Sequence, residues 1–188
     1  DPEAYNEYLR GHYLLDKRTS ESVPAAVEAY QAAVNRDPAF ARAYAELAQA
    51  YSLLPQLVGS ERAEALDKAT FAAQRALALD STVAAGHAAL GNIHNREWRW
   101  SEGRASLERA LALDSTDQSA RRWLATNLLV QGDAQGAMRL LEGPIRRTGD
   151  RRMRELMAVA QGIGGDHAAA LLTARAATAS DSTSAASR

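Results

Sequence analysis

Five arginines within nine residues form the densest group of charge in the sequence. They are Arg146, Arg147, Arg151, Arg152 and Arg154. A guanidinium donates paired hydrogen bonds that match a carboxylate or a phosphate, so the cluster could hold a phosphate or an acidic peptide. Solvated charge at a turn is the default interpretation, and no basic stripe extends the cluster as a nucleic-acid footprint would. We therefore expect no nucleic-acid partner, and we keep an acidic protein partner as the alternative.

Histidines are the other candidates for chemistry. His87 and His94 lie seven residues apart, which places them on one helical face. Paired metal ligands more usually lie three or four residues apart with a third ligand nearby. We therefore expect no metal at this pair.

Catalytic and cofactor-binding patterns are scarce. The glycine-rich stretch Gly162–Gly165 lacks the lysine and the preceding strand of a phosphate-binding loop, and it is more typical of a turn. The absence of cysteine excludes disulfides and thiol catalysis. Carboxylates such as Glu102, Glu108 and Asp114 are scattered without a pocket to desolvate them. We expect no cofactor and no enzymatic activity in this chain.

A repeat sets the positions of all these residues. The tripeptide Asp-Ser-Thr begins at Asp80 and again at Asp114, 34 residues later, and Asp181 begins a third copy 67 residues further on. Asp37 precedes Asp80 by 43 residues, which is one period plus an insertion of about nine. Fixed periods of this length indicate stacked structural units.

Three positions recur ahead of each Asp at spacings of four and three, which place them on one helical face. The five triads are Ala26, Tyr30, Ala33; Ala69, Ala73, Ala76; Gly103, Leu107, Ala110; Ala137, Leu141, Pro144; and Ala170, Ala174, Ala177. A second set at helical spacing precedes each triad, most clearly at Tyr44, Leu47 and Tyr51. Each unit is therefore predicted to be two helices.

The pattern resembles the tetratricopeptide repeat, a helix-turn-helix unit of about 34 residues. The resemblance implies an all-α, right-handed α-solenoid of about five repeats, in a single domain spanning 1–188. We place the repeats at 4–38, 39–81, 82–115, 116–149 and 150–182. Small residues such as Gly91 and Gly103 would let helices approach closely, and a larger side chain there would overpack.

The insertion falls in the second repeat, between Pro55 and Arg62. We expect it to lengthen the following helix, to about residues 61–79. In the next repeat, Trp98 and Trp100 flank the turn between the helices. Trp98 is interpreted as stiffening the turn and Trp100 as filling an inter-helix site, with an aromatic anchor for a partner as the less favoured alternative.

Composition fits a solenoid and limits the partners. The 188 residues are 46% hydrophobic and 24% charged, with a formal net charge of -1. Such a balance argues against general attraction to nucleic acid or anionic lipid, and no apolar run reaches the roughly 20 residues needed to cross a bilayer. We expect no membrane insertion and a cytoplasmic location, although the lack of cysteine does not distinguish cytoplasm from periplasm. Because it begins at Asp1 rather than Met, we expect the chain to be a fragment of a longer protein.

A narrower resemblance concerns that longer protein. The segments Tyr8–Leu15 and Glu97–Ser101 resemble the tetratricopeptide regions of large bacterial signalling proteins. There the repeats follow a kinase, a nucleotide cyclase or a winged-helix domain, none of whose motifs is present in this chain. The resemblance implies a regulatory, protein-binding role.

The resemblance also implies which residues face a ligand in the concave groove. The partner-binding residues that we predict are Arg42, Gln49, Asn92, Asn95, Arg96, Arg122, Thr126 and Arg152, with Ser52, Leu129 and Glu155 at related positions. Amides, hydroxyls and arginines suit an extended, acidic peptide or a partner domain. The lysine and asparagine clamp of the best-known peptide readers is not carried over, because Ala88 and Trp123 replace two of its members.

Self-association is the alternative from another class. Solenoids usually end in a polar capping helix, but the stretch 168–177 is rich in alanine and few residues follow it. This end would therefore contact another part of a longer protein or a second copy of the chain.

Overall fold

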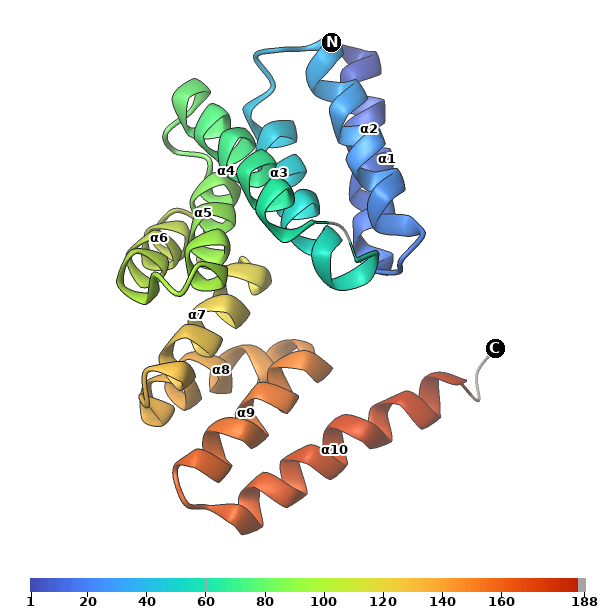
Figure 1. Ribbon diagram of the computed structural model, residues 1–188. Coiled ribbons are helices and arrows are strands. Elements are labelled where there is room, and N and C mark those ends of the chain that lie inside the picture. The colour runs from blue at the N-terminus through green and yellow to red at the C-terminus, as the bar shows by residue number, and fades with distance from the viewer. Residues whose placement is uncertain (60, 186–188) are drawn as a thin grey trace. The chain divides into compact units, whose positions relative to one another are not determined.

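The structure is a computed structural model that describes residues 1–59 and 61–185. Within that part all regular secondary structure is helical, which confirms the predicted all-α class (Figure 1). The helices are α1 (Pro2–Lys17), α2 (Ser22–Arg36), α3 (Ala41–Leu57), α4 (Arg62–Leu79), α5 (Ala84–Arg96), α6 (Trp100–Leu113), α7 (Gln118–Val130), α8 (Ala134–Thr148), α9 (Arg151–Ile163) and α10 (His167–Ala185).

Aspartates fix where many of these helices begin. The side chain of Asp1 accepts hydrogen bonds from backbone N–H groups of α1, and Asp117, Asp133, Asp150 and Asp166 do the same for α7, α8, α9 and α10. These bonds satisfy amides that have no partner within the helix. The aspartates that recur with the repeat lie instead at helix ends, because Asp37, Asp80 and Asp114 directly follow α2, α4 and α6.

The chain divides into two compact units, Asp1–Ala120 and Arg121–Arg188, which are described separately. In the first unit, α1 packs on α2, α3 on α4, and α5 on α6, and α3 also contacts α1, α2 and α5. The predicted triad residues of these three pairs are all buried. Alanines therefore occupy much of the core, and the helices can approach closely.

Gly91 and Gly103 mark the closest approach, between α5 and α6. A Cβ atom added to Gly91 would lie 2.5 Å from Cγ of Leu107 and 3.0 Å from the carbonyl oxygen of Gly103. A Cβ atom added to Gly103 would lie 3.2 Å from the carbonyl oxygen of Gly91. The two helix backbones are in contact here, which confirms that the two glycines allow a close approach.

The insertion in the second repeat lengthens both of that repeat's helices. Helix α3 has 17 residues and α4 has 18, against 13 and 14 in α5 and α6. The expected lengthening of α4 is confirmed, but α3 also continues through Pro55 to Leu57. A turn that includes Gly59, with φ +68°, joins them. Residues at the end of α3 and the start of α4 line a pocket together with the end of α5.

In the second unit, α9 contacts both α8 and α10. Its core contains Leu124, Leu141, Met153 and Met157, all buried. Of the stretch Gly162–Gly165, the first two residues end α9, and Gly164 and Gly165 lie in the turn to α10, where a turn was predicted.

Candidate peptide-binding surface

One face of α3 carries the polar side chains that define the candidate surface in the first unit. The stripe consists of Arg42, Glu46, Gln49 and Gln56. They lie four, three and seven residues apart in turn, and these spacings place them on one side of the helix. Arg42 and Gln56 are exposed, and Glu46 and Gln49 are half-buried. Because α3 contacts α1 on one side and α5 on the other, the stripe runs along a surface formed by three first helices of consecutive repeats.

Arg42 lies at a pocket near the start of this stripe. The pocket has a volume of about 500 Å³ and is lined by Tyr8, Arg42, Glu46, Asp80 and Thr82, together with the start of α5 and the end of α6. The Asp80 carboxylate accepts hydrogen bonds from the backbone and the hydroxyl of Thr82, at 2.8 and 2.7 Å. These bonds lower the pKa of Asp80, so this end of the surface combines a cation with fixed negative charge.

Glu46 is the unusual titrating group of this pocket. Burial, together with the negative charges of Asp117 and Asp16 and against the opposing effect of Arg18, raises the pKa of its carboxyl to about 7. The carboxyl is therefore about half protonated near neutral pH.

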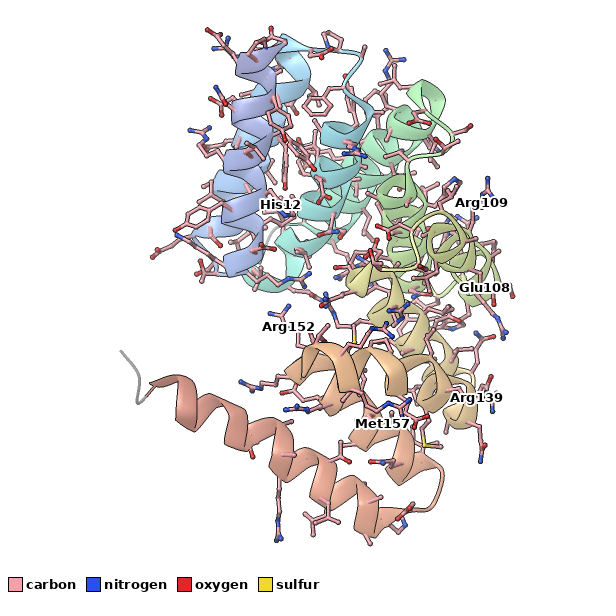
Figure 2. All side chains as sticks on the ribbon, turned by 180° about the vertical axis from the view of Figure 1, so that it is seen from behind. His12, Glu108, Arg109, Arg139, Arg152 and Met157 are labelled. Atoms are coloured by element: carbon pink, nitrogen blue, oxygen red, sulfur yellow. The ribbon has the colours of Figure 1, made fainter. Side chains whose placement is uncertain are left out.

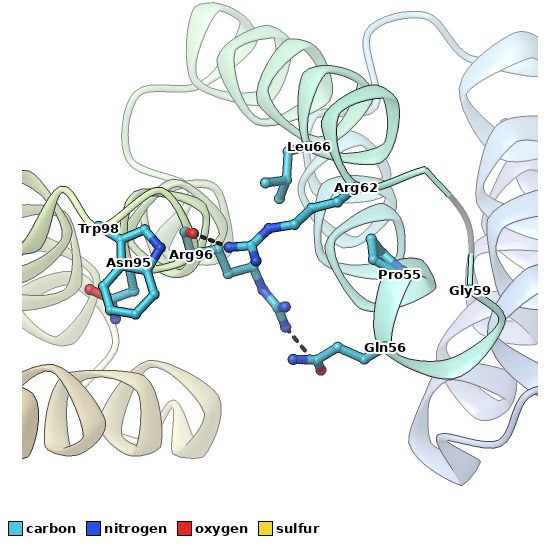
Figure 3. A pocket seen from close by; sticks show the side chains of 8 residues that line it. All are labelled: Pro55, Gln56, Gly59, Arg62, Leu66, Asn95, Arg96 and Trp98. Atoms are coloured by element: carbon cyan, nitrogen blue, oxygen red, sulfur yellow. Dashed lines mark hydrogen bonds between the residues drawn. The ribbon is translucent and has the colours of Figure 1, made fainter.

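A second pocket lies at the other end of the stripe, where α3, α4 and α5 meet (Figure 3). Its volume is about 530 Å³. The lining residues are Pro55, Gln56, Gly59, Arg62, Leu66, Asn95, Arg96 and Trp98. Two of these residues carry positive charge and none carries negative charge. Of the predicted residues, the structure thus brings Asn95 and Arg96 together in a basic pocket.

The interactions of Arg96 and Arg62 leave the pocket positive. Nη2 of Arg96 donates to Oε1 of Gln56 at 3.3 Å, and Nη2 of Arg62 donates to the backbone carbonyl of Arg96 (Figure 3). Burial lowers the pKa of Arg96, and the nearby positive charge of Arg62 lowers it further. Among the described residues, neither guanidinium has a carboxylate within ion-pair distance.

Asn92 and Ser52 lie beneath the surface rather than on it. Both are buried, with 5% and 1% of their areas exposed. Nδ2 of Asn92 donates to Oγ of Ser52 at 3.1 Å, and that hydroxyl donates to the carbonyl of Gln49 at 2.8 Å. The pair joins α3 to α5 inside the protein.

The remaining predicted residues belong to the second unit. Arg122 is mostly buried and lies 4.0 Å from the Asp150 carboxylate, and Leu129 is buried. Thr126 is exposed, with its hydroxyl bonded to the carbonyl of Arg122. Arg152 is exposed at the start of α9 (Figure 2), and Glu155 pairs with Arg151 at 2.8 Å.

Gln56, Arg62 and Glu46 were not among the binding residues predicted from the sequence. Trp98 was interpreted as a residue that stiffens its turn. The backbone of Trp98 has φ +63°, in the left-handed region, and 72% of the residue is exposed. Gly132 and Gly165 hold the same place in the next two repeats, with φ +84° and +89°. Glycine therefore makes this turn without any stiffening ring. Comparison of these three turns is the signal that could have singled out Trp98.

Another pocket, of about 410 Å³, lies outside the predicted surface. It is lined by residues of α2, α3 and α4, among them Tyr44, Tyr51 and Phe71. Phe71 is 70% exposed. This pocket is the alternative docking place that experiments must distinguish from the α3 stripe.

The described part of the chain offers neither a metal site nor a membrane-spanning helix. Within residues 1–59 and 61–185, no group of three or more His, Asp or Glu side chains could hold a metal ion. No described helix is both long enough and apolar enough to cross a bilayer.

Comparison with known proteins gives the fold its name. No protein-family model and no curated protein sequence matches the chain. Among solved structures, MamA is similar with a TM-score of 0.64 and 20% identity, over 90% of this chain and 95% of MamA. TTC0263, a thermophilic tetratricopeptide-repeat protein of Thermus thermophilus, has a TM-score of 0.67 and 24% identity, over 82% of this chain and 79% of that protein.

A third similar structure is the first tetratricopeptide-repeat domain of Spaghetti (RPAP3), bound to the HSP90 peptide SRMEEVD. It has a TM-score of 0.53 and 17% identity, over 69% of this chain and 94% of that domain. Similarity at these identities concerns the fold. Together with the paired helices and their 34-residue period, it shows that the chain has the tetratricopeptide-repeat fold.

Proposed function

We propose that the chain is a non-catalytic scaffold that binds an extended, acidic peptide or partner segment along α3 and α5. The observation that supports this most directly is the polar stripe of α3, which has a pocket at each end. Extended peptides need hydrogen-bond partners for their backbone, and the stripe offers amide and guanidinium groups for that purpose.

The length of the stripe sets the length of the ligand. Arg42 and Gln56 are 14 residues apart on a continuous helix, which corresponds to about 21 Å at 1.5 Å per residue. An extended chain advances about 3.3 Å per residue, so a segment of about six residues would reach from one pocket to the other. The peptide in the similar RPAP3 domain has seven residues, of which three are acidic, and this supports a ligand of the same kind here.

The biological setting of this scaffold follows from the narrower resemblance given above. We infer a regulatory module of a bacterial signalling protein, in which the repeats recruit a partner. In the second unit, Thr126 and Arg152 are exposed on first helices and are proposed to contact the same kind of ligand.

Selected peptides would test the binding surface. A random peptide library displayed on phage is selected against the whole chain, and the strongest binder is titrated calorimetrically into the wild type and into Arg42→Glu and Arg96→Glu. We expect each charge reversal to weaken binding at least tenfold. Arg75→Glu, which reverses an exposed arginine on α4, should change the affinity less than twofold. Equal affinity for all four proteins would reject the proposed surface.

Self-association is the second candidate, because apolar side chains are exposed at the end of the second unit. Leu171 and Leu172 on α10 are 53% and 66% exposed, and Val159 and Ile163 on α9 are 52% and 54% exposed. Exposed apolar groups of this kind often mark an interface. Light scattering tests this: a dimer that Leu171→Glu or Leu172→Glu dissociates would support it, and a concentration-independent monomer would remove it.

A further inference from the structure

The pocket at the end of α5 has three features that the packing of the fold does not require. They are two neighbouring arginines without a carboxylate among the lining residues, a guanidinium nitrogen that has no hydrogen-bond partner among the described residues, and a tryptophan in a backbone conformation suited to glycine.

Like charge is concentrated in the pocket. The guanidinium groups of Arg62 and Arg96 lie close enough for the charge of one to lower the pKa of the other. The nearest basic residue along the chain, Arg99, is paired instead with Glu97 and Glu102, at 3.4 and 3.1 Å. An anion placed between Arg62 and Arg96 would relieve their repulsion and form charge-assisted hydrogen bonds.

The side chain of Arg96 has unused donor capacity. Its Nε is buried, and among the described residues no acceptor lies within hydrogen-bond distance of it. A buried donor without a partner is costly, and in native structures such a group calls for an explanation. A bound carboxylate accepting from the guanidinium would supply one. Arg62 already has a structural role, because it donates to the carbonyl that ends α5.

Trp98 adds an aromatic surface at an energetic cost. In its turn, the N–H of Trp98 donates to the carbonyl of Asn95 and the N–H of Arg99 donates to that of His94, at 3.3 and 2.9 Å. The turns at Gly132 and Gly165 have the same two bonds. The left-handed conformation is strained for a bulky residue, and strain of this kind is concentrated at functional sites. The exposed ring stands beside Asn95 at the edge of the pocket (Figure 3).

From these observations we propose that Arg62 and Arg96 bind a carboxylate of an acidic peptide, while the Trp98 ring packs against an adjacent apolar side chain of the same peptide. The proposal rests on the proposed function and specifies it: the acidic end of the bound segment lies at this pocket, and the opposite end lies near Arg42. Aromatic residues and arginine are the side chains most often dominant in such contacts.

Blocked hexapeptides of alternating leucine and glutamate test this directly, with the glutamine version as the uncharged control. Binding is followed by NMR through the indole N–H of Trp98 and the Nε–H of Arg96. We expect the glutamate peptide to shift both signals and the glutamine peptide to leave them in place. Equal shifts from the two peptides would overturn the proposal. Displacement of the glutamate peptide by equimolar inorganic phosphate would also overturn it, because the site would then be a general anion site.

Variants link the signals to the residues. Arg62→Gln, Arg96→Gln and Trp98→Gly should each weaken the glutamate peptide at least fivefold, whereas Arg109→Gln on α6 (Figure 2) should change its affinity less than twofold. Trp98→Asn provides a second variant that tolerates the same backbone conformation. Unchanged affinity in the Arg96 and Trp98 variants would overturn the proposal.

Failure of this inference is distinguishable from failure of the proposed function. If the phage-selected peptide loses affinity in Arg42→Glu but binds normally to Arg62→Gln and Trp98→Gly, the α3 surface remains and the pocket is excluded. If the pocket variants weaken binding and Arg42→Glu does not, the pocket remains and the extended surface is excluded.

Discussion

Trp98 and Gly132 lie 34 residues apart and have the same left-handed backbone conformation, with φ values of +63° and +84°. Both close the first helix of their repeat: the N–H of each donates to the carbonyl three residues earlier, and the N–H of the next residue donates to the carbonyl five residues before it. One turn geometry is thus built with two residues whose conformational costs differ. The difference can be measured.

Substitutions at these two positions should differ in their effect on stability. Gly132→Ala should lower the free energy of unfolding by about 1 kcal/mol, because a Cβ atom is unfavourable at this φ. Trp98→Gly should leave it unchanged within about 1 kcal/mol, since relief of strain offsets the loss of the 5.5 Å edge-to-face contact with Trp100. Urea denaturation of both variants checks this. A loss of several kcal/mol in Trp98→Gly would show that the ring is structural.

Close approach of α5 and α6 gives a second prediction. Gly91→Ala places a methyl group against Leu107 and the carbonyl of Gly103, and overpacking should lower the free energy of unfolding by about 1–2 kcal/mol after the gain in helix propensity. Gly162→Ala is the matched control in α9. Its added Cβ would meet the Cβ of Ala170 at 4.0 Å, an ordinary contact, so this variant should be neutral or slightly stabilising. A stable Gly91→Ala protein would contradict the packing described.

The buried bond between Asn92 and Ser52 predicts an effect on stability without an effect on binding. Ser52→Ala leaves the Asn92 amide without this acceptor and should cost about 1–3 kcal/mol. A double-mutant cycle with Asn92→Ala should show a coupling energy of about 1 kcal/mol. Peptide affinity should stay within twofold in every variant that remains folded. A large loss of affinity in folded Asn92→Ala would restore this residue to the ligand-binding set.

The raised pKa of Glu46 predicts a pH dependence of stability. Because its pKa is about 7 in the folded chain and near 4.5 when unfolded, the folded state binds more protons between these values. Stability from this group should therefore be fully present below about pH 4.5 and fall, by about 2–3 kcal/mol, as pH rises through 7. Glu46→Gln should remove this component of the slope between pH 5 and 8. The exposed Glu28→Gln control should retain it, and identical slopes in the two variants would contradict the assignment.

Helices and core contacts follow from short-range patterns, which is why the sequence predicted them. Small residues at spacings of three and four identify the buried face of each helix. Gly91 and Gly103 lie where two helix backbones come into contact, as their lack of a side chain predicts. The binding pockets depend on elements far apart in the chain. Gln56, Arg62 and Trp98 come from the end of α3, the start of α4 and the turn after α5, and the insertion determines how far the first two extend.

The position of a residue within the repeat also did not predict which polar side chains are buried. Asn92 occupies a position that the resemblance assigned to the groove, but its side chain turns into the space left by small neighbours and bonds to Ser52. Arg122 likewise lies beside a carboxylate, at Asp150. A rule based on position gives the face of the helix, whereas the local partner decides whether the side chain is available to a ligand.

Photocrosslinking tests the central claim most directly, which is that the ligand lies along α3. A benzoylphenylalanine is placed at Gln49 on the polar stripe or, as the matched control, at Phe71 on the alternative pocket, and each protein is irradiated with the phage-selected peptide. We predict that the peptide is crosslinked through position 49 and not through position 71. Crosslinking through position 71 alone would contradict the account.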